Sequence, residues 1–297
     1  PGGFLRQPLA EPDAAARTVD LAQLARFFAN PARAFLTQRL QLAPPDTVEG
    51  LPEREPFALD GLGRYRLREE LVAHAGTAED RALVRASAQS AGELPPGTIG
   101  EVDFAATGAA ATAFAARLAR VRLAEPPPAL ELDLDLAPFR VTGRVAEFTA
   151  EGPLLFRCGK RRARDLVEAW LHHVAAGCVR PGLVTTLLTQ DGTSRFGPVP
   201  DPAGILRGLL NLYWAGLCQP LRFFPASALA LVEGGKQPME SALKKWEGDE
   251  YRGLAGEKED PAIDCCFRHE LPLNDDFEQI AQTVLGPLLE HETRTET

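Results

Sequence analysis

The sequence lacks the features that mark several large classes of protein. No uninterrupted apolar run reaches the roughly 18 residues of a transmembrane helix, and the chain opens without a secretory leader of roughly 15 to 30 residues. Five cysteines are present, and none of their spacings matches a metal site: Cys158, Cys178, Cys218, Cys265 and Cys266. We therefore expect a protein of the reducing cytoplasm, with free thiols, no membrane contact and no cofactor.

The sequence also lacks an excess of positive charge. It has 32 Lys and Arg against 41 Asp and Glu, which makes the net charge −9. Nonspecific DNA-binding proteins usually carry a basic excess, because contacts from Lys and Arg to phosphates supply most of their affinity. The composition therefore argues against a domain that binds DNA over its whole surface.

Local groups of basic residues remain within this acidic chain. They are Lys160, Arg161, Arg162 and Arg164; Arg64, Arg66 and Arg68; and Arg117, Arg120 and Arg122. Two interpretations fit each group: a strip that contacts nucleic acid, or a solvated face whose charges pair with the abundant carboxylates. The group that begins at Lys160 is the densest, and the first interpretation applies best there.

The length and composition suit a large folded unit. With 297 residues and 45% hydrophobic residues, the chain can bury a large core, as one domain or as a domain with an appended lobe. Residues 1–17 are rich in Pro, Ala and charge, so we expect a linker from the preceding part of a longer chain. We expect residues 18–292 to form the domain and residues 293–297 to be a frayed tail.

The centre of the sequence, residues 141–176, predicts a β-hairpin followed by a long helix. Apolar and polar residues alternate over residues 141–148, turn residues follow at 151–153, and residues 154–156 resume an apolar strand. From Ala163 onward the apolar residues recur at three- and four-residue steps, which is the period of a helix with one buried face.

Similar patterns predict the other elements and, together, an α/β (α+β) fold with a mixed sheet flanked by helices. Helices are expected between Asp20 and Asn30, over residues 32–42, 61–75, 79–90 and 101–121, after Asp201, twice within residues 226–246, and over residues 277–289. Residues 129–137 alternate leucine with acid, as in a strand with one wet face. Asp191-Gly192 is a hairpin turn between residues 183–188 and 195–199.

The order of glycine, strand, hairpin, strand, basic loop and helix in residues 141–176 resembles the restriction-endonuclease-like core of the PD-(D/E)XK superfamily. The resemblance implies a metal-binding Asp in a G-x-x-D setting on the first strand and a D/E-x-K triplet on the second. Here Ala146 stands where the Asp belongs, and Arg157 and Cys158 precede Lys160 without an acid. Because Mg²⁺ at a scissile phosphate needs oxygen ligands, we expect a nuclease-like fold with degenerate catalytic residues and no metal site.

The whole chain resembles the C-terminal domain of RecC, the gamma chain of exodeoxyribonuclease V, which is the RecBCD enzyme. The similarity runs from about Val19 to about Leu289. Its most telling segments are VDLAQLARFFANPARAFLTQRLQL at residues 19–42, EPFALDGLGRYRLREELV at residues 55–72, and LPPGTIGEVDF at residues 94–104.

This resemblance implies a role and partners. It implies a non-catalytic domain that contacts DNA and the RecB and RecD subunits of a heterotrimer, whose complex is an ATP-dependent helicase and exodeoxyribonuclease V. The implied process is double-strand-break repair and recombination, supported through complex assembly and strand separation. The nuclease resemblance also puts the basic loop on the nucleic-acid face, so the predicted DNA-binding residues are Lys160, Arg161, Arg162 and Arg164.

An alternative is a working Mg²⁺-dependent PD-(D/E)XK-type DNA nuclease with other ligands. These would be Glu101, Asp133 or Asp135, and Glu147, together with Lys160. Glu147 lies one residue past the position of the missing Asp. A shift of one residue along a strand turns a side chain to the opposite face, so Glu147 could replace that ligand only if a bulge intervened.

Overall fold

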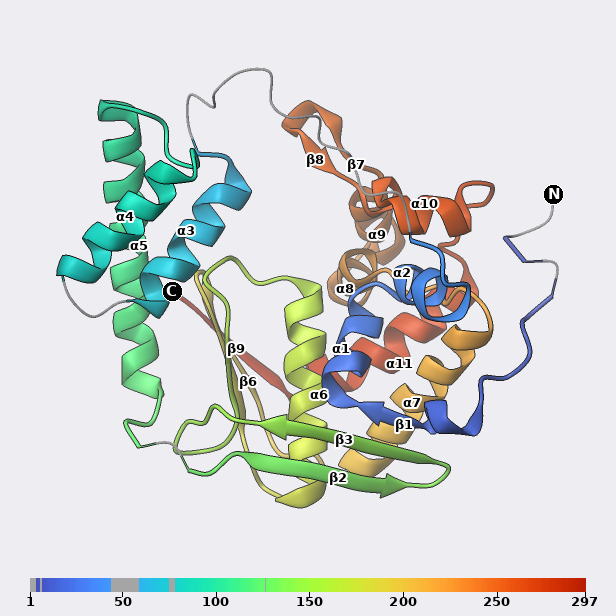
Figure 1. Cartoon of the computed structure of the whole chain (residues 1–297). Helices are drawn as coiled ribbons and strands as arrows, with labels where there is room; N and C mark the ends of the chain where they lie inside the picture. Colours follow the sequence, from blue (N-terminus) through green and yellow to red (C-terminus); the bar gives the residue numbers. More distant parts are fainter. Residues whose placement is uncertain (1–3, 6, 44–58, 75–77, 126) are drawn as a thin grey trace.

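The computed structural model describes residues 4–5, 7–43, 59–74, 78–125 and 127–297, and it confirms a mixed α/β architecture (Figure 1). The helices are α1 (Leu21–Ala29), α2 (Pro31–Ala34), α3 (Gly61–Ala73), α4 (Ala78–Ser90), α5 (Thr98–Val121), α6 (Ala163–Val179), α7 (Pro202–Cys218), α8 (Pro225–Glu233), α9 (Pro238–Glu247), α10 (Pro261–Phe267) and α11 (Asp275–His291). The strands are β1 (Thr18–Asp20), β2 (Leu130–Leu136), β3 (Phe139–Val145), β4 (Leu154–Phe156), β5 (Thr185–Thr189), β6 (Gly192–Phe196), β7 (Gly248–Asp249), β8 (Leu254–Ala255) and β9 (Glu292–Glu296).

The larger sheets are mixed, as predicted. One has the strand order β1-β3-β2, with β3 parallel to β1 and antiparallel to β2. The other has the order β4-β5-β6-β9, with β4 parallel to β5 and the remaining pairs antiparallel. The hairpin predicted around Asp191-Gly192 is confirmed as β5 and β6, because Thr189 pairs with Gly192 across that turn.

The hairpin predicted between β3 and β4 is wrong in its pairing. The seven residues of β3 pair with β2, from Phe139 opposite Leu136 to Val145 opposite Leu130. Of the predicted hairpin only the turn end forms, where the Leu154 N–H donates to the Glu147 carbonyl over 2.9 Å. The reason is proximity and length, since β2 joins β3 through a short turn and offers a full-length alternating strand.

Helix α6 runs through the middle of the molecule and was predicted correctly (Figure 1). It contacts α1 and α7 along its length, β5 of one sheet and β2 of the other. Its predicted apolar face is buried, and Trp170 and Leu166 are 0% exposed. Because so many elements pack on this one helix, its first turn has a well-defined position relative to all of them.

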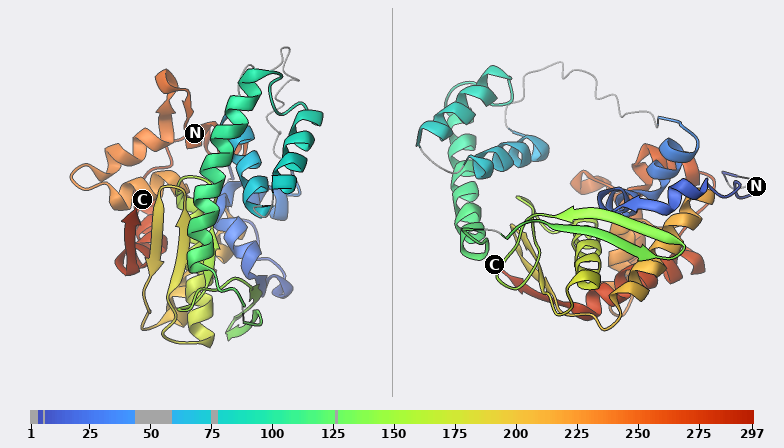
Figure 2. Two further views of the ribbon diagram at one scale, coloured as in Figure 1. Left: turned by 90° about the vertical axis from the view of Figure 1, so that its left-hand side faces the viewer. Right: turned by 60° about the horizontal axis from the view of Figure 1, so that its bottom comes forward.

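Helices α3, α4 and α5 stand beside the rest of the molecule and have an apolar cluster of their own (Figure 2). A second cluster, which includes Phe114, Leu118 and Leu188, joins α5 to the four-stranded sheet. The Arg117 guanidinium adds hydrogen bonds to the carbonyls of Thr189, Gln190 and Gly192, at 3.0 to 3.2 Å. Arg117, a candidate for nucleic-acid contact, is therefore used to hold the two parts together.

The two ends of the described chain are packed against the domain. The segment 293–297, expected to be frayed, belongs largely to β9, whose Glu292 pairs with Phe196 of β6. The unpaired backbone groups of an edge strand explain this, because β9 satisfies them. Near the other end, within the expected linker, the Leu9 N–H donates to the Cys218 carbonyl at 2.8 Å, and the Arg17 guanidinium lies 4.3 Å from the Trp214 ring centroid.

No helix in the described ranges is both long and apolar enough to cross a bilayer.

A buried histidine on α6 makes the fold sensitive to acid. His173 is 2% exposed, its Nε2 lies 2.9 Å from the Gly197 carbonyl, and its Nδ1 lies 3.0 Å from the Thr185 hydroxyl. A carbonyl only accepts, so the neutral ring donates from Nε2 and accepts the Thr185 proton at Nδ1. Burial is the main cause that lowers the pKa of His173, from 6.5 to about 4.

We expect the free energy of unfolding to fall by about 2 kcal/mol because of His173 when the pH is lowered from about 7.5 to about 5. The unfolded chain protonates His173 near pH 6.5 and the folded chain only near pH 4, so stability is complete above the higher value and falls as the pH drops between the two. Urea unfolding at both pH values measures the loss. In His173→Gln this part of the pH dependence should disappear, and an unchanged slope in that variant would contradict the assignment.

Candidate functional site

The positions that the nuclease resemblance compares with metal ligands lie just after two strands. Ala146 is exposed and follows the last residue of β3, while Arg157 and Cys158 follow β4. Within the residues that the structure describes, no group of three or more His, Cys, Asp or Glu side chains is placed to hold a metal ion. Arg157 and Cys158 instead make contacts that hold the fold together.

Arg157 is held inside the protein by an ion pair with the first turn of α6. Its Nε lies 3.3 Å from Asp165 Oδ2, and the two side chains are 9% and 12% exposed. The guanidinium also lies 4.6 Å from the centroid of the Tyr65 ring on α3. Burial raises the pKa of Asp165, and the guanidinium groups of Arg157, Arg164 and Arg162 act against that rise. The position that the nuclease resemblance assigns to an acid is therefore occupied by a buried cation.

Cys158, next to Arg157, also joins the four-stranded sheet to α3. The thiol is buried, and burial raises its pKa to about 11. Its carbonyl accepts a hydrogen bond from Arg68 Nη1 at 2.9 Å, and the same nitrogen donates to Gln190 Oε1 at 2.7 Å. Arg68, another candidate for nucleic-acid contact, therefore positions α3 on the sheet.

The four predicted DNA-binding residues are not equivalent in the structure. Arg161 points inward and is 7% exposed, with Nη1 3.0 Å from Glu233 and Nη2 2.8 Å from Glu292. Lys160, Arg162 and Arg164 are exposed. One of the four is thus an internal cation, and three remain on the surface.

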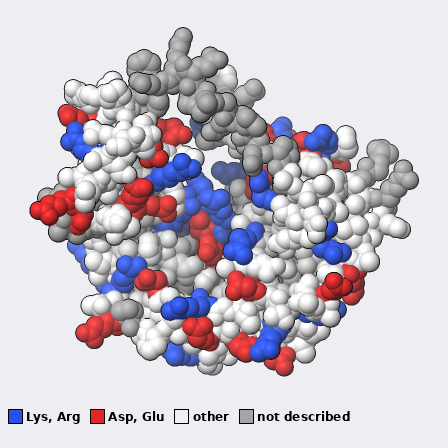
Figure 3. Space-filling model, in the orientation of Figure 1, with Lys and Arg blue, Asp and Glu red and all other residues white. Residues whose placement is uncertain are grey.

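A groove of about 870 Å³ opens at the first turn of α6, and we call it the α6 groove. Its charged lining residues are Arg26, Arg33, Arg161, Arg162, Arg164, Lys245, Glu233, Glu257 and Asp260. Lys160 does not line it. Figure 3 shows Lys and Arg side chains gathered at the centre of this face, over the N-terminal end of α6 and beside α3.

Three of these cations were missed by sequence reasoning. Arg26 belongs to α1, Arg33 to α2 and Lys245 to α9, and none belongs to the basic groups picked out from the sequence. Only the packing of α1, α2 and α9 around the start of α6 brings them together. No local pattern in the sequence carries that information.

The three carboxylates of the α6 groove are all engaged inside the protein. Glu233 binds Arg161 at 3.0 Å. Glu257 accepts hydrogen bonds from the first-turn amides of α8, from Ala226 at 2.9 Å and from Ser227 at 2.7 Å, and burial raises its pKa.

Asp260 is the third of these carboxylates, and it caps α10. Its Oδ1 accepts from the Ala262 N–H at 2.9 Å, and its Oδ2 lies 3.6 Å from Arg33. None of the three is therefore left to attract a cationic ligand into the groove.

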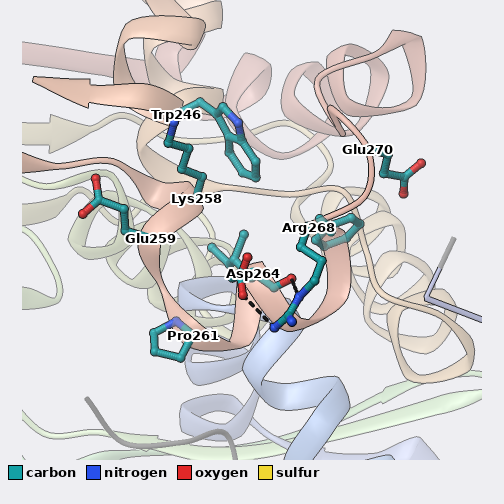
Figure 4. A pocket seen from close by; sticks show the side chains of 9 residues that line it. Trp246, Lys258, Glu259, Pro261, Asp264, Arg268 and Glu270 are labelled. Carbon is teal, nitrogen blue, oxygen red and sulfur yellow. Dashed lines mark hydrogen bonds and ion pairs between the residues drawn. The ribbon is translucent and has the colours of Figure 1, made fainter. Parts of the chain in front are cut away.

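A second cavity, of about 530 Å³, lies beside α9 and α10 and has a different charge pattern (Figure 4). Its charges are mixed and pair with one another or with near neighbours. Arg268 donates to Asp264 at 2.7 Å, and Lys258 forms an ion pair with Glu247. This cavity therefore has no cation excess comparable to that of the α6 groove.

The acids of the alternative nuclease interpretation lie on three different parts of the chain, and three of the four have an arginine partner. Glu101 of α5 lies 3.0 Å from Arg85, and Glu147 lies 2.9 Å from Arg122. Asp133 of β2 accepts from Arg140 at 2.6 Å across the sheet. Asp135 is exposed on the same face of β2, as expected for alternating acids on a strand with one wet face.

Comparisons with known proteins find sequence similarity to a single family over most of the chain. A family model described as the RecC C-terminal domain matches residues 16–236. The chain is 30% identical over 230 residues to the RecBCD enzyme subunit RecC of Escherichia coli (strain K12), across 76% of this chain and 20% of that protein. It is 27% identical over 281 residues to RecBCD enzyme subunit RecC of Mycobacterium tuberculosis (strain ATCC 25618 / H37Rv), across 88% of this chain and 24% of that protein. The chain thus spans about a fifth to a quarter of the length of the curated relatives that it matches.

Proposed function

We propose a function from the premise that this chain belongs to the family of RecC C-terminal domains. In our proposal it is a non-catalytic structural domain of an exodeoxyribonuclease V (RecBCD) gamma chain, and it contacts DNA and the other subunits. Its partners are then RecB and RecD, and its process is double-strand-break repair and recombination. The similarity to RecC subunits of RecBCD enzymes over most of this chain supports the proposal.

We propose further that the core is a PD-(D/E)XK-like fold that has lost its catalytic residues. The order β3, β4, α6, β5, β6 supports this, as does the parallel pairing of β4 with β5 across the α6 connection. A helical crossover between parallel strands places the first turn of the helix near the end of the strand that precedes it. In the fold as we propose it, Arg157 and Asp165 occupy that corner.

The observation that carries the non-catalytic assignment is the ion pair between Arg157 and Asp165. Metal-assisted phosphodiester hydrolysis needs hard oxygen ligands that are free to bind Mg²⁺. Here Asp165, the acid in the first turn of α6, is bound to Arg157 at 3.3 Å, and Ala146 offers no ligand. A bound metal would have to displace a guanidinium from a buried carboxylate.

Calorimetry with Mg²⁺ and Mn²⁺, and digestion of single- and double-stranded DNA, test this assignment on the full chain. We expect no specific metal binding and no cleavage. Glu147→Ala and Lys160→Ala are the informative controls, because the alternative nuclease depends on both residues. Cleavage by the wild-type chain that is lost in these variants would overturn the non-catalytic assignment.

The assignment to a multisubunit complex has a separate test. Co-expression of the chain with RecB and RecD, followed by size-exclusion chromatography, should give a co-eluting species. Elution of the chain apart from both subunits would count against the proposed subunit contacts.

A further inference from the structure

We propose that the α6 groove binds the phosphodiester backbone of a DNA strand through Arg26, Arg162, Arg164 and Lys245. The inference rests on the proposed function, which includes contact with DNA but names no binding surface beyond the basic loop. It moves the expected contacts away from Lys160 and Arg161, and it adds cations from α1 and α9.

The first support is the charge that remains after internal pairing. The α6 groove has six cations and three carboxylates, and all three carboxylates have partners inside the protein. Arg33 and Arg161 are paired with Asp260 and Glu233. Four cations remain outside these two ion pairs, and the groove as a whole has three more cations than carboxylates.

The four remaining cations have weak partners or none. Arg164 approaches Asp165 only at 3.9 Å, and that carboxylate already binds Arg157. For Arg26, Arg162 and Lys245, the described part of the chain contains no ion pair. A surplus of unpaired cations in one concave place attracts an anion and little else.

The second support is that this arrangement works against the stability of the domain. Arg162 is the N-cap of α6 and Arg164 lies in its first turn, at the positive end of the helix dipole, where cations are unfavourable. Burial, followed by the nearby charges of Arg157 and Arg164, lowers the pKa of Arg162. An anion bound at this place would remove the repulsion, so the cluster is explained by a ligand and not by folding.

The third support is the chemistry of the donors. Three of the four cations are arginines, whose planar fork of N–H groups matches the geometry of a phosphate. The cations come from α1, α6 and α9, so the positive charge is spread around the groove and is not concentrated at one position. A polymer with a phosphate at every residue can satisfy several such donors at once and independently of sequence, which favours a nucleic-acid backbone over an acidic peptide.

The test compares two charge-matched double variants by fluorescence anisotropy. Arg162→Gln/Lys245→Gln removes two cations from the α6 groove. Arg180→Gln/Arg207→Gln removes two exposed cations from the far end of α6 and from α7, and neither lines the groove. The probes are a labelled single-stranded oligonucleotide, the same sequence as a duplex, and a labelled poly-glutamate peptide, each titrated at several salt concentrations.

We expect the groove variant to bind single-stranded DNA roughly a hundredfold more weakly than wild type, and the control variant to bind within about twofold. The slope of log affinity against log salt should become shallower by about 1.4 in the groove variant for a single strand, or about 1.8 for a duplex. The melting temperature of the groove variant should stay close to that of wild type, because removing the cation at the start of α6 is favourable while removing Lys245 from the last turn of α9 is unfavourable, and both effects are small. The tighter of the two DNA probes identifies the strand state of the ligand.

Three results would overturn the inference, and they can be told apart from a failure of the proposed function. If the groove and control variants bind DNA equally well, the groove is not the surface, while the DNA-contacting role survives. If poly-glutamate binds more tightly than either DNA, the ligand is an acidic protein segment. If the wild-type chain binds no DNA probe, the DNA-contacting part of the proposed function fails together with the groove.

Discussion

Arg157→Glu is expected to destabilise the domain by roughly 3 to 5 kcal/mol and to produce no nuclease activity, although it places an acid where the nuclease resemblance expects one. Arg157 is 9% exposed and lies 3.3 Å from Asp165, which is itself largely buried. The substitution would leave two carboxylates together without a cation, and burial already raises the pKa of Asp165. It would also remove the guanidinium that lies over the Tyr65 ring of α3.

Urea unfolding measures the loss of stability, and DNA digestion with Mg²⁺ and Mn²⁺ tests the activity. The matched control is Arg157→Met/Asp165→Asn, which removes both charges and keeps similar volumes. That variant should recover most of the stability, since replacing a buried ion pair by uncharged side chains is often neutral. A stable Arg157→Glu protein that cleaves DNA would refute the structural role of Arg157 and revive the nuclease interpretation.

Glu292→Ala is expected to destabilise the domain by roughly 3 to 5 kcal/mol, because it leaves a buried guanidinium without its main partner. Arg161 is 7% exposed and Glu292 is 5% exposed, and Nη2 of Arg161 donates to both carboxylate oxygens of Glu292, at 3.0 and 2.8 Å. Glu292 also begins β9, which pairs with β6. The substitution should therefore loosen both the basic loop and the edge of the four-stranded sheet.

The control for this second prediction is Glu233→Ala. Glu233 binds the same arginine at 3.0 Å, but its side chain is 42% exposed, so we expect a loss of only about 1 kcal/mol or less. Chemical denaturation of both variants gives the comparison. Equal effects of the two substitutions would show that Arg161 depends on neither carboxylate in particular, and the buried pair would lose its assigned importance.

Much of the secondary structure could be predicted from the sequence, because the signals for it are local. Asp20 caps α1, and the Asn30-Pro31 break, the long α6 and the β5–β6 turn all lie where patterns of spacing and turn residues put them. The pairing of strands was harder to predict from the sequence. The strand β3 pairs with β2 and β1 and not with β4, and β9 forms where a frayed tail was expected. Those choices depend on which edges are available in the folded sheet.

In the candidate site, too, the chemistry of single residues could be predicted from the sequence, while their contacts could not. The sequence showed that Ala146, Arg157 and Cys158 offer no set of oxygen ligands, since side-chain chemistry needs no coordinates. It also showed that the stretch from Lys160 onward is basic. It could not show that Arg161 turns inward to Glu292, which is 131 residues away along the chain.

The sequence by itself determined the kinds of element, the family resemblance and the absence of acids at the nuclease-like positions. Each of these depends on residue identity and short-range spacing. The tertiary structure alone decided which cations are neutralised, which remain free, and that Arg26 and Lys245 join Arg162 and Arg164 in one groove. The physical reason is that an ion pair or a groove depends on distances across the fold, and those distances arise only when α1, α6 and α9 pack together.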